Sequence, residues 1–130
     1  MVSDSVGDFI IQLKNAGMVG KTTVSLPYSK LRHAIAEKLA VAGYVAGVEV
    51  KGKDIKKNLE VTLKYDNGTH TINGVKRVSK PGRRLYAKVG EIYPVKFGKG
   101  HIILSTPAGI LTGEEARQAN VGGEQLFTIW

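Results

Sequence analysis

The periodicity of the apolar residues changes along this chain, and that change most limits its fold. Apolar residues recur at helical spacing over residues 6–13 and 31–42, whereas the segments between and after them alternate as strands do. The strands expected in this half of the chain are residues 22–26, 44–50, 59–65 and 69–75. The resulting order, αβαβββ, predicts an α+β fold rather than a repeating βα fold.

Residues with capping and turn preferences support these helix limits. Ser3 is expected to cap the first helix, with Asp4 in its first turn and Gly17 at its end. Ser29 is expected to cap the second helix, and Gly43 occupies the position where a left-handed residue ends a helix.

The second half of the chain is predicted to be mainly β. Thr112 and Glu115 form a capping-box pattern for a short helix that ends at Ala119. The expected strands are residues 84–89, 101–104 and 124–130. The turn signal Asp66-Asn67-Gly68 suggests a boundary. We therefore expect two lobes, residues 1–66 and 67–130, which pack together because each is marginal in size alone.

The charge of the chain is concentrated in its middle. The whole chain has 19 basic and 11 acidic residues, a net charge of +8. Residues 51–101 hold 13 of the basic and 4 of the acidic residues, whereas residues 102–130 are net negative with 1 and 3. A localised excess of this kind favours a polyanionic partner, of which nucleic acid is the most common.

Several classes of function are excluded or disfavoured by the sequence. The chain has no cysteine, so it has no disulfide and no thiolate metal site, and a reducing compartment is expected. The three histidines, His33, His70 and His101, have no metal-ligand spacing. We expect no cofactor, no catalytic residue, no signal peptide and no membrane span, and thus a cytoplasmic protein.

One segment invites a nucleotide-binding interpretation. Gly20-Lys21-Thr22 could end a phosphate loop, but Asn15 occupies the position of the required first glycine. A phosphate loop also follows a strand and precedes a helix, whereas here a helix precedes and a strand follows. An ordinary loop is the better interpretation, and a nucleotide-handling enzyme is a remote alternative.

The most informative stretch is the basic segment at residues 78–86. Pro81 and Gly82 suit the two central positions of a type II turn, which would place Lys80 and Arg83 at its ends. Tyr86 offers a ring for base stacking. Further cations that extend this cluster are Arg77, Arg84 and Lys88. Nucleic-acid contact is favoured over a solvated hairpin end.

Two short loops offer finer contacts. Ser105 and Thr106 place adjacent hydroxyl groups at a strand end, where they could bind base edges or 2′-hydroxyl groups or simply form a turn. The pair Gly122-Gly123 would allow a ligand close to the backbone, or would form a flexible pivot into the last strand. Spacing alone does not decide between these alternatives.

These motifs together resemble those of the bacterial small ribosomal subunit protein eight family. The matching stretches are residues 14–16, 29–31, 79–86, 103–106, 115–117 and 121–124, followed by the C-terminal Trp130. The resemblance covers essentially the whole chain, and the motifs occur in the same order at the same separations. Where the family usually has Ser-Thr-Ser, this chain has Ser105-Thr106-Pro107. Its start, Asp4-Ser5-Val6-Gly7, replaces the usual Asp-Pro-Ile-Ala.

The resemblance implies a structural protein that binds the central domain of small-subunit rRNA and supports assembly of the platform. It also implies neighbouring ribosomal proteins as partners and the protein's own operon mRNA as a further candidate partner. A dedicated mRNA repressor would use the same surface. The residues that the resemblance assigns to rRNA are Asp4, Lys14, Asn15 and Lys30 in the first lobe and, mainly in the second, Lys80, Arg83, Arg84, Tyr86, Ser105, Thr106, Gly122, Gly123 and Glu124.

Overall fold

The computed structural model describes residues 4–53, 56–92 and 100–130. Over these residues the chain forms two compact units. The first, which we call the N-unit, is Phe9–Ile72, and the second, the C-unit, is Asn73–Trp130 together with the chain up to Asp8. Both units combine helices with antiparallel strands, so the predicted α+β class is confirmed.

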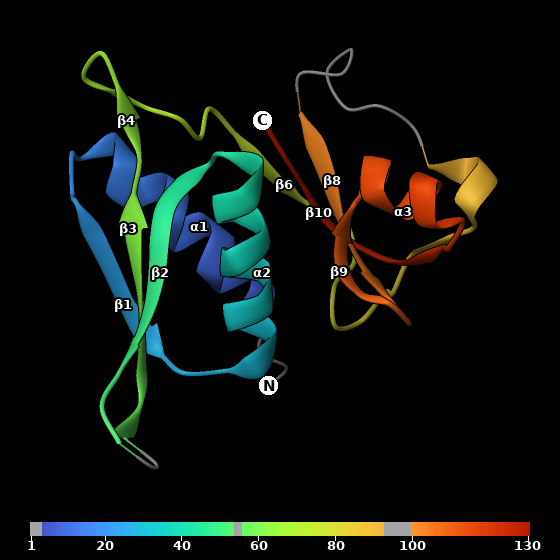
Figure 1. The fold of residues 1–130 in the computed structure, drawn as a ribbon, viewed down its shortest axis with the longest axis horizontal. Helices are drawn as coiled ribbons and strands as arrows, with labels where there is room; N and C mark the ends of the chain where they lie inside the picture. The colour runs from blue at the N-terminus through green and yellow to red at the C-terminus, as the bar shows by residue number, and fades with distance from the viewer. Residues whose placement is uncertain (1–3, 54–55, 93–99) are drawn as a thin grey trace. The chain divides into compact units, whose positions relative to one another are not determined.

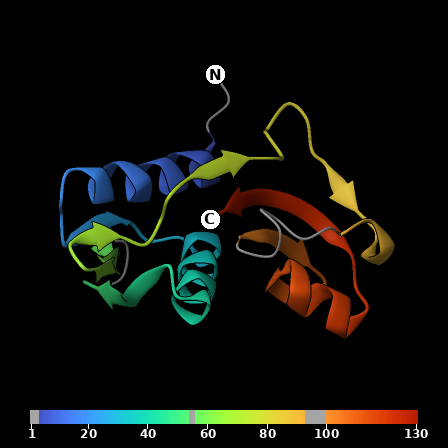
Figure 2. The ribbon, with the colours of Figure 1, turned by 90° about the horizontal axis from the view of Figure 1, so that it is seen from above.

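The N-unit is a three-stranded sheet with two helices on one side of it (Figure 1, Figure 2). Its elements are α1 (Ser5–Met18, which begins in the C-unit), β1 (Thr23–Pro27), α2 (Lys30–Ala42), β2 (Val45–Lys51), β3 (Asn58–Leu63), β4 (Tyr65–Asp66) and β5 (Thr69–His70). The strand order is β1-β3-β2 and both pairings are antiparallel. Alternate residues of β1 and β3, such as Val24, Leu26 and Val61, are buried, as expected for a sheet with one covered face.

The C-unit is built around its last strand. Its elements are β6 (Val75–Arg77), β7 (Tyr86–Ala87), a 3₁₀ turn η2 (Val89–Glu91), β8 (His101–Thr106), β9 (Gly109–Thr112), α3 (Gly113–Ala119) and β10 (Gly123–Ile129). The strand order is β6-β10-β8-β9, and β7 also pairs with β10. Ala116 of α3 is fully buried in a small core with Ile102, Leu104 and Ala87, which fixes the helix against the sheet.

Local capping signals place two of the three helices as predicted. Ser29 caps α2, Gly43 ends it with a φ of 91°, and Thr112 forms a reciprocal capping box with Glu115 at the start of α3. The first helix differs. It begins at Ser5, so Asp4 precedes the helix instead of lying in its first turn, and it continues past Gly17 to Met18. The predicted cap, Ser3, lies outside the described residues.

The strand predicted at residues 69–75 is wrong, because the two ends of this segment pair with different partners. The β5 end forms a hairpin with β4 across Asn67 and Gly68, which both have positive φ and confirm the predicted turn. The other end, β6, pairs with β10 of the C-unit. The strand predicted at residues 84–89 is likewise reduced to β7, because only Tyr86 and Ala87 pair with β10.

The β4–β5 hairpin belongs with the N-unit. Tyr65 donates its hydroxyl hydrogen bond to the Lys21 carbonyl, and Thr71 Oγ1 donates to the Tyr44 carbonyl at 2.8 Å. These contacts place the end of the N-unit at Ile72. The division into residues 1–66 and 67–130 stays a prediction. No helix in the described ranges is long and apolar enough to cross a membrane.

Candidate nucleic-acid interface

Three predicted site residues form a row across three neighbouring strands of the C-unit. Glu124 of β10 is the direct partner of Tyr86 on β7 and of Ser105 on β8. Directly opposed residues of an antiparallel pair point to the same face of the sheet. The row therefore brings a ring, a carboxylate and a hydroxyl together on one face, which we call the Tyr86 face. The next residues, Ala87 and Leu104, are buried under α3 on the opposite face.

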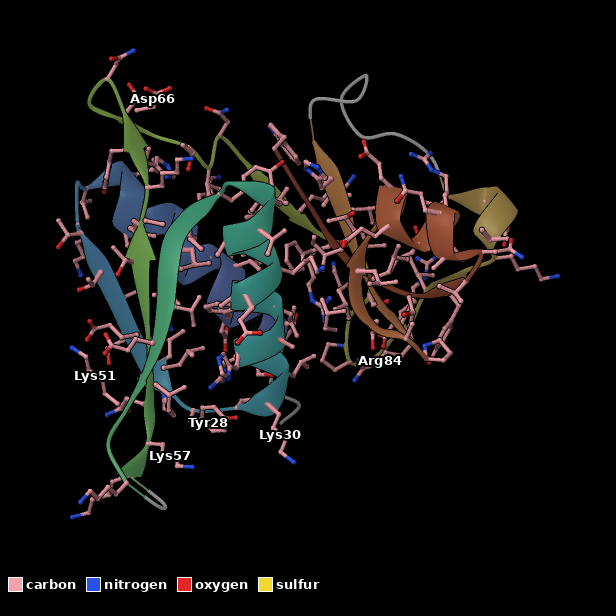
Figure 3. All side chains as sticks on the ribbon, in the orientation of Figure 1. Tyr28, Lys30, Lys51, Lys57, Asp66 and Arg84 are labelled. Atoms are coloured by element: carbon pink, nitrogen blue, oxygen red, sulfur yellow. The ribbon has the colours of Figure 1, made fainter. Side chains whose placement is uncertain are left out.

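The Tyr86 face has an exposed ring and a fixed cation. The Tyr86 side chain is 70% exposed, which is unusual for a residue of this size paired inside a sheet. Arg84 Nη1 donates to Glu124 Oε2 at 3.1 Å, and the Arg84 side chain remains half exposed (Figure 3). Glu124 thus orients the Arg84 guanidinium toward the row, while its other N–H groups can still donate. Residue spacing did not predict this ion pair.

The basic turn at residues 80–83 differs from the predicted type. Lys80 and Arg83 exchange two backbone hydrogen bonds of 2.9 Å each, so they do lie at the two ends of a tight turn. Gly82 does not have the positive φ that a type II turn needs at its third position, so the type II prediction is wrong. The side chains of Lys80 and Arg83 are exposed on this turn.

A buried serine holds this turn in place, and sequence reasoning missed it. Ser79 is fully buried; its Oγ accepts a hydrogen bond from the Leu85 N–H at 2.9 Å and donates to the Leu85 carbonyl at 3.1 Å. Backbone hydrogen bonds from Ser79 to the Gln125 carbonyl and from Gln125 to the Leu85 carbonyl attach both ends of the segment to β10. The position of the exposed cations therefore depends on one hydroxyl group.

The two adjacent hydroxyl groups at the end of β8 are not equivalent. Thr106 Oγ1 donates to the Gly109 carbonyl at 2.8 Å and accepts from the Ala108 N–H at 3.1 Å, so it closes the β8–β9 turn. The expectation that this hydroxyl is free for RNA is therefore not met. The Ser105 hydroxyl makes no hydrogen bond with any residue in the described part of the chain.

Gly122 and Gly123 are required by packing within the sheet. A Cβ atom on Gly122 would lie 2.3 Å from the Ala87 carbonyl oxygen, and one on Gly123 would lie 2.2 Å from the Ser105 carbonyl oxygen. Neither contact is tolerable. These glycines let β10 enter between β7 and β8, which answers the question of what approaches their backbone closely: the protein itself on this side.

Asp4 has a structural role at the start of α1. Its carboxylate accepts a hydrogen bond from the Gly7 N–H at 3.1 Å and pairs with Arg77, whose Nε lies 3.0 Å from Oδ2. Partial burial opposes ionisation of Asp4, but the hydrogen bonds from Arg77 and Gly7 outweigh it, so the pKa of the carboxyl is lowered. Arg77 also donates to the Leu126 carbonyl and is largely buried, so it does not extend the exposed basic cluster as expected.

The remaining predicted residues belong to the N-unit. Lys14 and Asn15 are on α1, where Asn15 is exposed and Lys14 is partly covered. Lys30 is the first residue of α2 and is exposed (Figure 3). Gly20-Lys21-Thr22 forms the loop from α1 to β1, as the ordinary interpretation predicts. Across residues 4–53, 56–92 and 100–130, no group of three or more acidic or histidine side chains could hold a metal ion.

The fold and this site define a class of protein: a small α+β protein with basic and aromatic side chains on an open sheet face, suited to binding RNA. Comparison with known proteins identifies the family. The chain belongs to the family described as Ribosomal protein S8, whose profile matches residues 4–130.

Proteins of similar sequence agree along the whole chain. The chain is 46% identical over 128 residues to small ribosomal subunit protein uS8 of Acidovorax sp. (strain JS42), covering 98% of each protein. It is 46% identical over 129 residues to the uS8 protein of Dictyoglomus thermophilum, covering 99% of this chain and 98% of that protein. It is 43% identical over 130 residues to the uS8 protein of Mycoplasma mycoides subsp. mycoides SC, covering all of both. The predicted family, and the prediction of a ribosomal protein rather than an enzyme, are confirmed.

Proposed function

We propose that this chain binds the central domain of small-subunit rRNA directly and thereby supports assembly of the platform. As a member of the ribosomal protein S8 family, it is a structural constituent of the small ribosomal subunit, where it meets rRNA and neighbouring ribosomal proteins. The domain of the rRNA and the contact residues are the parts that we add to this family role.

The observation that carries the proposal is the Tyr86 face. An exposed tyrosine ring can stack on an unpaired base, and a hydroxyl without a protein partner can bind a base edge or a 2′-hydroxyl group. Arg84, oriented by Glu124, is placed to bind phosphate beside them. Because base contacts specify and phosphate contacts position, this combination suits recognition of one particular RNA.

The other predicted residues contribute in different ways. Lys80 and Arg83 supply exposed positive charge on the turn beside the Tyr86 face, and Lys14, Asn15 and Lys30 supply polar contacts from the N-unit. Thr106, Gly122 and Gly123 act through the backbone they shape, because their side-chain positions are used within the sheet. Asp4 acts by fixing Arg77 and the start of α1.

Affinity measurements with two RNAs test this proposal. We expect Ser105→Ala to weaken binding to a central-domain rRNA fragment more than binding to an unrelated RNA duplex, because it removes a specific contact. Arg84→Ala should weaken both to a similar extent, because it removes a phosphate contact. Equal losses on both RNAs for Ser105→Ala would show that this serine reads no RNA feature.

The same surface would bind the protein's own operon mRNA if that mRNA folds into a similar structure. Repression would then follow from competition between the two RNAs for one site. A leader-mRNA transcript that fails to compete with the rRNA fragment would exclude this second role.

A further inference from the structure

The N-unit contains a lysine that is fixed in place by a tyrosine ring. Tyr28 lies in the loop between β1 and α2, and Lys57 lies just before β3. The Tyr28 N–H donates to the Lys57 carbonyl at 3.1 Å, and Lys57 Nζ lies 5.7 Å from the centre of the Tyr28 ring. A cation within about 6 Å of a ring centre is attracted by the electron-rich face. Both residues lie at the same end of the N-unit (Figure 3).

The ring is itself held from a second direction. His33 of α2 contacts Tyr28 edge-on, with 5.7 Å between ring centres, and His33 Nε2 lies 2.8 Å from Glu37 Oε1. The backbone hydrogen bond and the two ring contacts therefore restrict where the Lys57 ammonium can go. An ordinary surface lysine has no such restraint and retains most of its rotamer freedom.

The surroundings of Lys57 are positively charged and weakly neutralised. Residues 51–57 contain four lysines and one acidic residue. Lys30, Lys53 and Lys56 are exposed, and none of them forms an ion pair with another described residue. The nearby carboxylates have other partners: Glu60 pairs with Lys51 at 3.2 Å, and Glu37 pairs with His33.

We propose that Lys57, positioned by Tyr28 and accompanied by Lys53 and Lys56, forms a second RNA-binding surface that contacts the phosphate backbone of an RNA helix without reading its sequence. We call this group the Tyr28–Lys57 cluster. It extends the single N-unit lysine, Lys30, that was predicted at this end of α2. The inference rests on the proposed function, because it assigns a further part of the same rRNA to this chain.

The chemistry of the cluster favours RNA over an acidic protein segment. Its exposed cations are all lysines, which act as point charges and suit phosphate groups in any orientation, whereas arginine suits planar carboxylates. Arg32 is directed elsewhere, since its Nη1 donates to the Pro27 carbonyl at 3.0 Å. A ribosomal protein also meets a continuous row of phosphates in its own assembly.

The salt dependence of RNA affinity tests this proposal with a matched control in the same unit. The variant is Lys57→Gln, and the control is Lys64→Gln, which removes an equal charge from an exposed lysine outside the cluster. Each lost phosphate contact should lower the slope of log affinity against log salt by about one unit. We expect this decrease for Lys57→Gln and no decrease for Lys64→Gln, and about twice the decrease for Lys56→Gln combined with Lys57→Gln.

Substitutions of Tyr28 separate positioning from charge. Tyr28→Phe keeps the aromatic face and should retain the wild-type slope, whereas Tyr28→Leu keeps an apolar side chain but loses the face and should lower the slope part of the way. Thermal unfolding of each variant shows whether the fold is intact. A loss of RNA affinity in Tyr28→Leu that follows only a loss of stability would overturn the positioning role.

The outcomes for the two proposals are distinguishable. If Lys57→Gln and Lys64→Gln have the same slope on both RNAs, the cluster does not bind RNA; an acidic protein partner would give this result. If Lys57→Gln lowers the slope equally on the central-domain fragment and on an unrelated duplex, the cluster binds RNA as proposed. If the wild-type protein shows no preference for the central-domain fragment while Lys57→Gln still lowers the slope, the proposed function fails and the present inference stands.

Discussion

Two serines of the C-unit show that the same side chain can serve the fold or the ligand. Ser79 is fully buried and its hydroxyl both donates to and accepts from the backbone of Leu85. Ser105 is partly exposed and its hydroxyl has no partner in the described part of the chain. The first position therefore contributes to stability, and the second is available to RNA.

These contacts predict opposite results for the two alanine variants. Ser79→Ala leaves a buried N–H and a buried carbonyl without partners, which should lower the free energy of unfolding by about 1–3 kcal/mol. Ser105→Ala should change it by less than about 0.5 kcal/mol. Urea unfolding of both variants checks this. A Ser79→Ala protein as stable as the wild type would mean that the Leu85 groups find water or another partner.

Asp4 should make stability depend on pH in the acid range. Its pKa is lowered in the folded protein, mainly by Arg77 against the opposing effect of burial, relative to about 3.9 in an unfolded chain. The carboxylate therefore stabilises the fold fully above the unfolded pKa, and this contribution is lost as the pH falls through the folded pKa. Asp4→Asn keeps a capping side chain but removes the charge.

The stability difference between wild type and Asp4→Asn should therefore be present at neutral pH and disappear in acid. Urea unfolding at a series of pH values measures it. A difference that stays constant down to the lowest pH would show that the ion pair with Arg77 contributes nothing and that only the cap matters.

At the scale of elements, the course of β10 depends on close backbone contacts. Gly123→Ala would place a Cβ atom 2.2 Å from the Ser105 carbonyl oxygen, so β10 and β8 must separate, which should cost about 1–3 kcal/mol. Gly82→Ala is the matched control, because Gly82 has open space around it and no positive φ, and it should cost less than about 0.5 kcal/mol. A larger cost for Gly82→Ala would indicate the type II turn after all.

The elements predicted correctly are those defined by nearby residues. The limits of α2 and α3 follow from Ser29, Gly43 and the Thr112–Glu115 box, which act within one or two turns. The Asn67-Gly68 turn is equally local. Such signals can be interpreted from sequence because their partners lie within a few residues.

The elements predicted wrongly depend on distant partners. Residues 69–75 have the composition of one strand, but β6 is separated from β5 because it pairs with β10, far along the chain. The roles of Arg77 and Ser79 also depend on partners that spacing does not reveal, namely Asp4 and the Leu85 backbone. Of the candidate site, the sequence predicted the residue types of the Tyr86 face but not the Arg84–Glu124 pair that orients it.

For the whole molecule, the central excess of positive charge is divided between the two units. Residues 73–101 carry eight basic residues and one acidic residue, whereas residues 51–72 carry five and three. The C-unit share surrounds a face with an exposed ring and a free hydroxyl, and the N-unit share includes the Tyr28–Lys57 cluster. Charge in the C-unit thus accompanies groups that can specify an RNA, and charge in the N-unit accompanies groups that can only position it.

Footprinting of the purified protein on small-subunit rRNA tests the central claim most directly, because it identifies the partner, the site and the specificity together. We expect protection confined to the central domain, reduced for Ser105→Ala at a subset of nucleotides and reduced throughout for Arg84→Ala. Protection should weaken steeply as salt rises, because bound phosphates release counterions. Protection in another rRNA domain, or scattered protection that does not change with Ser105→Ala, would contradict the account.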